Sequence, residues 1–137
     1  ADNLYITCKV KDGELYSGGQ GTQKGSGVFI YLDTKNECLK EPAEGVYKVW
    51  CSYKGDITVW QGNKGKWENS ELEGLQITPS VVSGGYELAF TIPLNRSFNK
   101  DAMRLCATLS TKTYTETLVH SNADRSCTWM KMNLGGH

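Results

Sequence analysis

Short segments in which apolar and polar residues alternate recur along the whole chain. In "LYITCKV", Leu4, Ile6, Cys8 and Val10 share one phase, and "GVFIYLD" at residues 27–33 repeats the pattern. Such alternation places each set of side chains on one face of a β-strand, and no window shows the apolar stripe of a helix. Further segments of this kind are 47–53, 57–59, 75–77, 86–92 and 103–109, with "YTETLVH" and "TWMKMNL" closing the sequence. About nine short strands predict an all-β fold, an antiparallel β-sandwich of jelly-roll or immunoglobulin-like type.

The length and charge of the chain limit what it binds. A chain of 137 residues fits one domain, so we expect a single, monomeric β-sandwich over residues 1–137, excised from or appended to a larger exported protein. Fifteen basic and fifteen acidic side chains cancel, and no segment concentrates Lys and Arg as a nucleic-acid partner would require. The apolar runs fall far short of the roughly 20 residues that span a bilayer, so we expect no membrane insertion.

Five cysteines lie far apart in the sequence. They are Cys8, Cys38, Cys51, Cys106 and Cys127. None forms a C-x-x-C pair, which disfavours a zinc ribbon or a thioredoxin-type site. An odd number allows at most two disulfides within the chain, with a connectivity that the sequence leaves open. Scattered cysteines in a chain rich in Tyr, Trp, Thr, Gly and Ser are typical of secreted or cell-surface proteins.

The sequence offers little catalytic chemistry. It has no G-x-S-x-G elbow, P-loop or H-E-x-x-H motif, and its two histidines are His120, at the end of a candidate strand, and the terminal His137. The 15 acidic residues include no pair that stands out as a general acid and base. With Met103, Met130 and Met132 these histidines leave a Met/His haem site conceivable, although methionines that alternate with polar residues are usually core. We therefore expect a protein that is not an enzyme.

The order of four segments resembles a known family. "ADNLYITCKVKD", "SGVFIYLDTKNE", "GVYKVWCSY" and "GGYELAFTIPL" follow one another as do the strands of carbohydrate-binding module family 9, within the DOMON-like β-sandwich group. In that family a "D-x-x-L-Y-V" strand precedes "D-S-V-E-I-F-L-D" and, later, "G-G-Y-x-x-E-x-x-I-P". The resemblance implies a sandwich with a sugar-binding face, commonly stabilised by calcium and attached to or partnering polysaccharide-degrading enzymes.

The family's ligand contacts can be transferred only position by position. Its acidic residue falls on Phe29, its basic and amide residues fall on Lys48 and Trp50, and a later amide falls on Cys106 or Thr108. The Glu of "G-G-Y-x-x-E" falls on Ala89. The family also clamps its sugar between two loop tryptophans, whereas the corresponding loops here, "GGQGTQKGSG" and "SNADRSC", contain no aromatic residue. A sugar would therefore need different contacts on this chain.

The strand phases predict which residues supply those contacts. If "KGD" is a three-residue turn, Trp50 lies directly across from Trp60. Two exposed rings would form a platform for the flat C–H face of a pyranose, with Lys48 and Arg104 as hydrogen-bond donors to hydroxyls or to an acidic sugar. The predicted carbohydrate-binding residues are Phe29, Tyr31, Lys48, Trp50, Trp60, Arg104 and Thr108.

Each of these features has a structural alternative. The tryptophan pair could instead stabilise its hairpin, or pack under residues 61–74, which we expect to be a loop. Trp67 in that loop is either a lid over the sugar or, as we favour, an anchor for the loop. The resemblance implies a calcium site at Asp33, Asn36 and Glu37, residue types that suit calcium, although an ordinary acidic turn is the commoner structure for such residues.

The sequence thus predicts a non-catalytic, lectin-like module that binds polysaccharide or oligosaccharide and targets a partner or attached enzyme. The alternatives are a cell-surface protein-interaction or adhesion domain on the same face, and a DOMON-type haem-binding domain.

Overall fold

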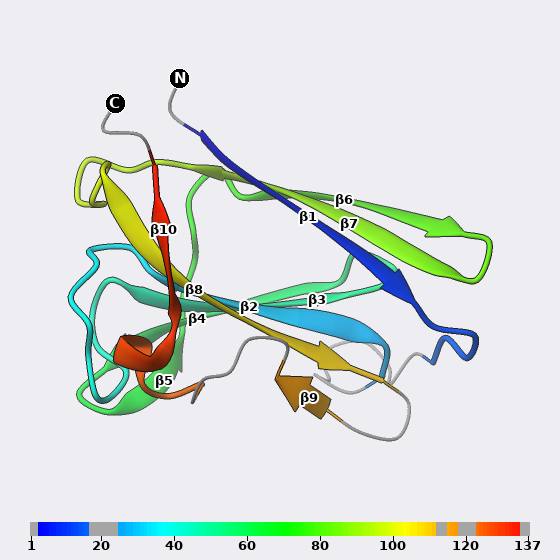
Figure 1. Ribbon diagram of the computed structural model, residues 1–137, viewed down its shortest axis with the longest axis horizontal. Helices are drawn as coiled ribbons and strands as arrows, with labels where there is room; N and C mark the ends of the chain where they lie inside the picture. The colour runs from blue at the N-terminus through cyan, green and yellow to red at the C-terminus, as the bar shows by residue number, and fades with distance from the viewer. Residues whose placement is uncertain (1–2, 17–24, 112–114, 118–122, 135–137) are drawn as a thin grey trace.

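Two antiparallel sheets pack face to face in the computed structural model, which describes residues 3–16, 25–111, 115–117 and 123–134 (Figure 1). The elements in chain order are β1 (Asn3–Lys11), β2 (Gly27–Asp33), β3 (Val46–Ser52), β4 (Ile57–Asn63), β5 (Lys66–Asn69), β6 (Gln76–Val82), β7 (Gly85–Pro93), β8 (Ala102–Ser110), β9 (Thr115–Thr117), the 3₁₀ turn η1 (Ser126–Thr128) and β10 (Met130–Asn133). The predicted antiparallel β-sandwich is confirmed, with ten strands among the described residues where about nine were expected. No helix in these parts of the chain has the length and apolar character to cross a membrane.

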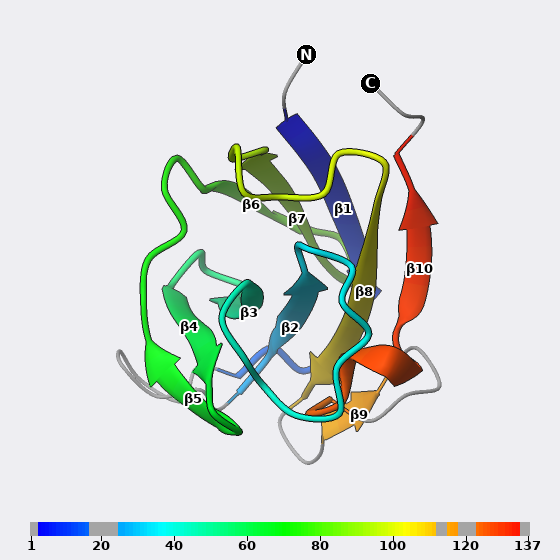
Figure 2. The same ribbon diagram turned by 90° about the vertical axis from the view of Figure 1, so that its left-hand side faces the viewer.

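The two sheets differ in size. The smaller has the strand order β1-β7-β6, and the larger has the order β10-β8-β2-β3-β4-β5, with β9 paired to β8. The larger sheet curves strongly, and β10 and β5 lie at its two edges (Figure 2). Strand β2 pairs with β3 on one side and with β8 on the other, so it lies in the interior of this sheet.

The core lies between the two sheets. It contains the residues whose alternation first indicated strands, and these are fully or partly buried against one another. The small sheet contributes Tyr86, Leu88, Phe90 and Ile92, which are at most 1% exposed, together with Leu4, Ile6, Cys8 and Val10. The large sheet contributes Val28, Ile30, Leu32, Val49, Cys51 and Met103. Burial of this much apolar surface is the main force that holds the sheets together.

The hairpin between β3 and β4 turns one residue earlier than predicted. The Ser52 amide donates to the Asp56 carbonyl, and the Gly55 amide donates to the Ser52 carbonyl, both over 2.9 Å. The turn is therefore Tyr53–Lys54–Gly55, and Gly55 has the positive φ of 96° that glycine adopts without strain. The expected pairing of Trp50 with Trp60 is wrong for this reason, because Trp50 pairs with Thr58 and Trp60 pairs with Lys48.

The segment 61–74, predicted as a loop, contains part of the large sheet. The end of β4 and all of β5 lie in it, with Gly62 paired to Trp67. At Gly62 a side chain would meet the backbone of Pro42 and Ala43, with the amide nitrogen of Ala43 only 2.2 Å from the added carbon. The connection between β2 and β3 thus packs directly on the β4–β5 hairpin, at the left-hand end of Figure 1.

Candidate functional site

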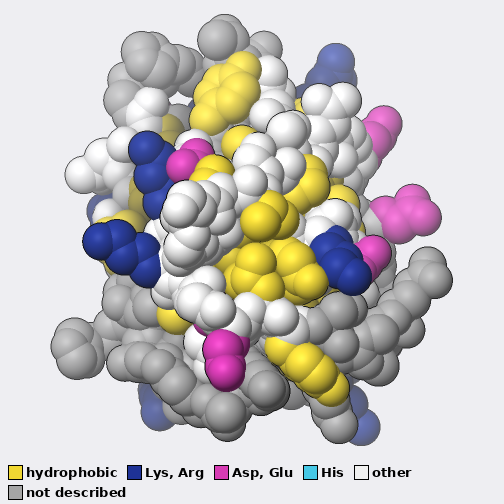
Figure 3. All heavy atoms as spheres, turned by 90° about the vertical axis from the view of Figure 1, so that its right-hand side faces the viewer, with side chains coloured by type: hydrophobic (Ala, Val, Ile, Leu, Met, Phe, Trp, Pro, Cys, Tyr) yellow, Lys and Arg dark blue, Asp and Glu magenta, His cyan; other side chains and the backbone are white. Residues whose placement is uncertain are grey.

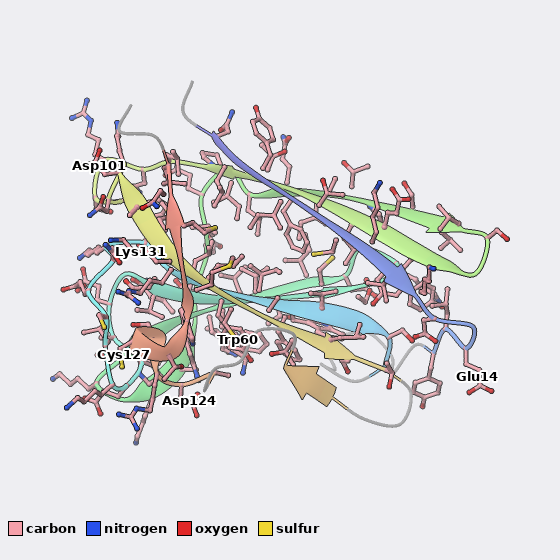
Figure 4. The ribbon with its side chains drawn as sticks, viewed as in Figure 1. Glu14, Trp60, Asp101, Asp124, Cys127 and Lys131 are labelled. Atoms are coloured by element: carbon pink, nitrogen blue, oxygen red, sulfur yellow. The ribbon has the colours of Figure 1, made fainter. Side chains whose placement is uncertain are left out.

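The outer face of the large sheet, which points away from β1, β6 and β7, carries an unusual number of aromatic side chains. Register places Phe29 and Tyr31 of β2 beside Trp50 and Lys48 of β3, and Lys48 beside Trp60 of β4. Figure 4 shows Trp60 and Asp124 on this side of the sheet. We call this set the aromatic face; its members are Phe29, Tyr31, Lys48, Trp50, Trp60, Trp67, Thr108 and Trp129.

Lys48 lies at the centre of the aromatic face. Its ammonium is 4.8 Å from the ring centroid of Trp60, 5.2 Å from that of Phe29, 5.8 Å from that of Trp67 and 5.9 Å from that of Tyr31. A cation over a ring face is attracted by its quadrupole, so four rings stabilise this charge. Burial lowers the pKa of Lys48, and the carboxylate of Asp124 opposes that shift. Lys48 is therefore a cationic hydrogen-bond donor with aromatic rings around it.

Trp67 of β5 contacts residues of this face that are distant from it in sequence. Its indole Nε1 donates a hydrogen bond of 3.0 Å to Asp124 Oδ1, which joins β5 to the segment before η1. The ring also lies 6.0 Å from Tyr31, measured between centroids. Trp67 lies in strand β5, so the expectation that it lies in a loop is wrong. Its half-buried ring, with that of Trp60, gives the face accessible aromatic surface.

Trp50 does not form the exposed platform that the sequence suggested. It is only 1% exposed, and its ring packs on Phe29 with the centroids 4.8 Å apart. The ring also occupies the space above Gly27, where an added side-chain carbon would lie 2.5 Å from it. An exposed Trp50 is therefore wrong, although Trp50 does share a face with Trp60. Any ligand on this face would meet Trp60 and Trp67 in place of Trp50.

Tyr31 and Trp129 form the covered part of the aromatic face. Their ring centroids lie 5.7 Å apart, and both residues are less than 10% exposed. Burial raises the pKa of Tyr31 to about 12, with a smaller contribution from the neighbouring Cys106. Leu39 and Ala123 pack against the same cluster from the segments on either side.

Thr108 of β8 places a buried polar atom beside Phe29. Register puts it directly beside Phe29, and it is 5% exposed. Its hydroxyl is close enough to the Tyr31 phenol to offset part of the pKa increase there, but it makes no hydrogen bond of ordinary geometry within the described residues. A buried hydroxyl without a partner costs free energy, and such groups often mark a site that a ligand or water completes.

Arg104 lies outside this cluster. Its Nε donates to Asn36 Oδ1 over 3.0 Å, which ties β8 to the turn after β2. The sequence placed Arg104 beside Lys48 on the sugar-binding face. Register instead puts Arg104 opposite Asp33 and Lys48 opposite Tyr31, so that Arg104 lies one strand repeat away from the ring cluster.

The candidate calcium loop uses its acidic side chain to shape a turn. Asp33 is fully buried, and its two carboxylate oxygens accept hydrogen bonds from the amides of Glu37 (3.2 Å) and Cys38 (3.0 Å). The side-chain oxygen of Asn36 accepts a hydrogen bond from Arg104. Among the described residues, no three His, Cys, Asp or Glu side chains gather as a metal site requires. Calcium at Asp33, Asn36 and Glu37 stays a prediction that a calcium-dependent melting temperature would test.

The methionine, histidine and cysteine side chains bear on the haem-binding and disulfide hypotheses. Met103 and Met132 pack in the core between the sheets, whereas Met130 is 47% exposed. Both histidines lie outside the described residues, as does most of the predicted loop "GGQGTQKGSG" at residues 18–27. All five cysteines are described, and no two of them form a disulfide in this structure.

Two hollows lie away from the ring cluster. One, of about 350 Å³, is lined by Glu44, Glu68 and neighbouring residues of β4 and β5. The other, of about 640 Å³, lies along residues 70–75 beside Ile57 and Val59 of β4. At the opposite end of the sandwich, where the β6–β7 hairpin lies, apolar side chains gather among polar and charged ones (Figure 3). None of these features combines aromatic rings with a half-buried cation as the aromatic face does.

Sequence reasoning missed Asp124 and Trp129. Asp124 lies 57 residues beyond Trp67, so only the folded chain brings the two together. Trp129 follows "SNADRSC", the segment in which the resembled family has a clamp residue, and its aromatic character was the available signal.

Comparison with known proteins identifies the fold. No family profile matches the sequence, and no curated protein sequence does either. The structure, however, is similar to a carbohydrate-binding module of family 9 from Caldicellulosiruptor kristjanssonii in complex with cellotriose, at 15% identity and a TM-score of 0.78, over 99% of this chain and 71% of that one. A structure of such a module from the same organism with glucose gives the same identity and TM-score and has 72% of its chain covered. The chain has the fold of carbohydrate-binding module family 9.

Proposed function

We propose that the chain is a non-catalytic module that binds a polysaccharide or oligosaccharide of glucose on the aromatic face. The observation that carries the proposal is the Lys48 ammonium, enclosed by four rings of which those of Trp60 and Trp67 are half-buried and accessible. Aromatic rings stack on the C–H face of a pyranose, and ammonium hydrogens donate to its hydroxyls. One surface here offers both kinds of contact.

One further fact favours a sugar over a protein partner. The proteins of similar fold were solved with cellotriose and glucose. Glucose polymers with free chain segments are therefore the first ligands to try.

The biological role follows from binding without catalysis. A module that holds polysaccharide raises the local concentration of an attached or partner enzyme on its substrate. Such a role places the protein outside the cell, either secreted or on the cell surface, in agreement with the composition of the chain.

Isothermal titration with glucose and cellotriose, together with affinity electrophoresis through soluble β-glucan, tests this proposal. We expect Trp60→Ala to weaken binding by about tenfold or more, because stacking on one ring contributes roughly 1–3 kcal/mol in comparable sites. Tyr5→Ala is the matched control. Tyr5 is 69% exposed on the other sheet, so its loss should leave affinity unchanged.

The competing functions predict different results. Wild-type protein that binds no glucan in either assay would overturn the proposal and would favour a protein-interaction or adhesion domain. A Soret band after haem addition would favour a haem-binding domain. Equal losses from Trp60→Ala and Tyr5→Ala would place the sugar elsewhere on the molecule.

A further inference from the structure

Two of the five cysteines lie on neighbouring segments that are far apart in sequence. The Cys127 amide donates a hydrogen bond of 3.0 Å to the Leu39 carbonyl, and the Leu39 amide donates one of 2.6 Å to Ser126 Oγ. The segment after β2, which carries Cys38, is thereby held against η1, which carries Cys127. Figure 4 shows Cys127 beside the loop that follows β2.

These two cysteines also differ from the other three in accessibility. Cys38 is exposed and Cys127 is half-buried, whereas Cys51 and Cys106 are fully buried. Cys8 is half-buried and points into the core between the sheets. Burial raises the pKa of the Cys8 thiol and raises that of Cys51 to about 12. Since the thiolate is the reactive form, the core cysteines react slowly with a soluble oxidant.

We propose that Cys38 and Cys127 form a disulfide in the mature protein. The bond would join the connection after β2 to the segment that carries Asp124. Both segments pack against the aromatic face, through Leu39 and Ala123. This inference does not depend on the proposed sugar binding, since it rests on the two backbone segments and on the accessibility of their thiols.

The chemistry needs an external disulfide as oxidant, either a thiol–disulfide oxidoreductase or oxidised glutathione. The Cys38 thiolate attacks that disulfide, forms a mixed disulfide and releases one thiol. The Cys127 thiolate then attacks the Cys38 sulfur of the mixed disulfide and releases the second thiol. Two protein thiols lose two protons and two electrons, and the oxidant's disulfide is reduced to two thiols.

The structural consequence is a closed ring that includes most of the chain. A crosslink between residues so distant in sequence restricts the unfolded chain strongly, because loop-closure entropy grows with the number of residues enclosed. We expect the melting temperature of the oxidised protein to exceed that of the reduced protein by about 5 to 10 °C.

Peptide mapping of the full chain tests the proposal directly. Reduced protein is incubated with oxidised glutathione, alkylated and digested with trypsin without reductant. Each cysteine falls in its own tryptic peptide, with Cys38 in "NECLK" and Cys127 in "SCTWMK". We expect these two peptides to appear joined, at the sum of their masses less two hydrogen atoms, and to separate on reduction.

Variants make the assignment specific. Cys38→Ser should abolish the joined peptide and leave Cys127 with a glutathione adduct, and it should remove the gain in melting temperature. Cys8→Ser is the control and should retain both. Glutathione adducts on Cys38 and Cys127 without a crosslink, unreacted thiols at both positions, or "ADNLYITCK" joined to "VWCSYK" in place of the expected pair would each overturn the proposal.

Discussion

On its inner face, β2 presents Val28, Ile30 and Leu32, each at most 1% exposed, to the facing small sheet. On its outer face, the same strand presents Phe29 and Tyr31 to an ammonium ion and to other rings. One stretch of seven residues thus builds an aliphatic core on one side and a mixed aromatic and charged surface on the other.

The difference follows from what covers each face. A second sheet packs on the inner face, where shape and apolar area decide which side chains fit. Within the described chain, the outer face is covered by loops, through Leu39 on one side and Ala123 on the other. Such partial cover allows Lys48 to keep its charge among rings. Alternation along a strand therefore assigns a side chain to a face, but the loops decide whether that side chain is buried.

Trp50 tests this distinction most severely, because it belongs to the outer face but is buried like a core residue. We expect Trp50→Ala to lower the free energy of unfolding by about 3–5 kcal/mol, as large-to-small changes at buried aromatic sites do. Phe90→Ala, on the inner face of the small sheet, is the matched comparison and should cost about the same. Urea unfolding measures both; a cost below about 1 kcal/mol for Trp50→Ala would show that the outer face lacks a packed layer.

The sequence predicted the faces of the strands better than it predicted their pairing. Periodicity of two assigns Phe29, Lys48 and Trp60 to the outer face, and the structure agrees. The pairing across the β3–β4 hairpin depends on which residue begins the turn, and the Ser52 hydroxyl accepts hydrogen bonds from the Lys54 and Asp56 amides there. A single-residue difference in the turn moved Trp50 from Trp60 to Thr58.

Other parts of the aromatic face depend on contacts that no local pattern contains. Strand β5 has only four residues with a single apolar side chain, Trp67, so its alternation was too short to recognise. Asp124 joins the aromatic face through the hydrogen bond that it accepts from Trp67, which lies 57 residues earlier in the chain. Burial of Trp50 required the absence of a side chain at Gly27, a relation between two strands.

Lys48→Met probes the charge at the centre of the outer face. Methionine retains most of the length and apolar surface of lysine but has no hydrogen-bond donor, so we expect glucan affinity to fall by about fivefold to tenfold. Stability should change by no more than about 1 kcal/mol, because the lost attraction to the rings is offset by the removal of a partly buried charge. Titration calorimetry and urea unfolding separate the two effects. Unchanged affinity would mean that Lys48 only stabilises the face.

Alkaline pH distinguishes the two faces through their buried titratable groups. The inner-face Cys51 thiol has a pKa of about 12 in the folded protein against 9.0 for an exposed thiol. Between these values the unfolded chain loses the proton while the native state keeps it, so stability is complete below pH 9 and is lost as the pH rises towards 12. For fully reduced protein we expect a loss of about 1 kcal/mol between pH 9 and pH 10.

Titratable groups of the outer face also change the stability in this pH range, and two of them act with opposite signs. Tyr31, with a pKa of about 12 against 10.0, adds to the loss above pH 10, whereas the lowered pKa of Lys48 makes stability rise with pH below 10.5. Cys51→Ser removes the contribution of the Cys51 thiol. Urea unfolding of this variant should show a flatter profile between pH 9 and pH 10, and a profile as steep as that of the wild type would assign the loss to other groups.

Trp67→Phe gives the smallest expected effect, because it leaves a smaller aromatic ring in place while it removes the indole N–H that donates to Asp124. A single hydrogen bond with a carboxylate at a partly exposed site should contribute about 0.5–1.5 kcal/mol to the free energy of unfolding. If the bond also holds the segment around Asp124 in position beside Lys48, glucan affinity should fall by a few-fold while stacking on the ring persists. Asp124→Asn removes the carboxylate charge near Lys48 but keeps a side-chain oxygen that can accept from the indole, so it should preserve most of the stability. A larger loss of stability in Asp124→Asn than in Trp67→Phe would show that the charge of Asp124, opposite Lys48, matters more to this face than the hydrogen bond does.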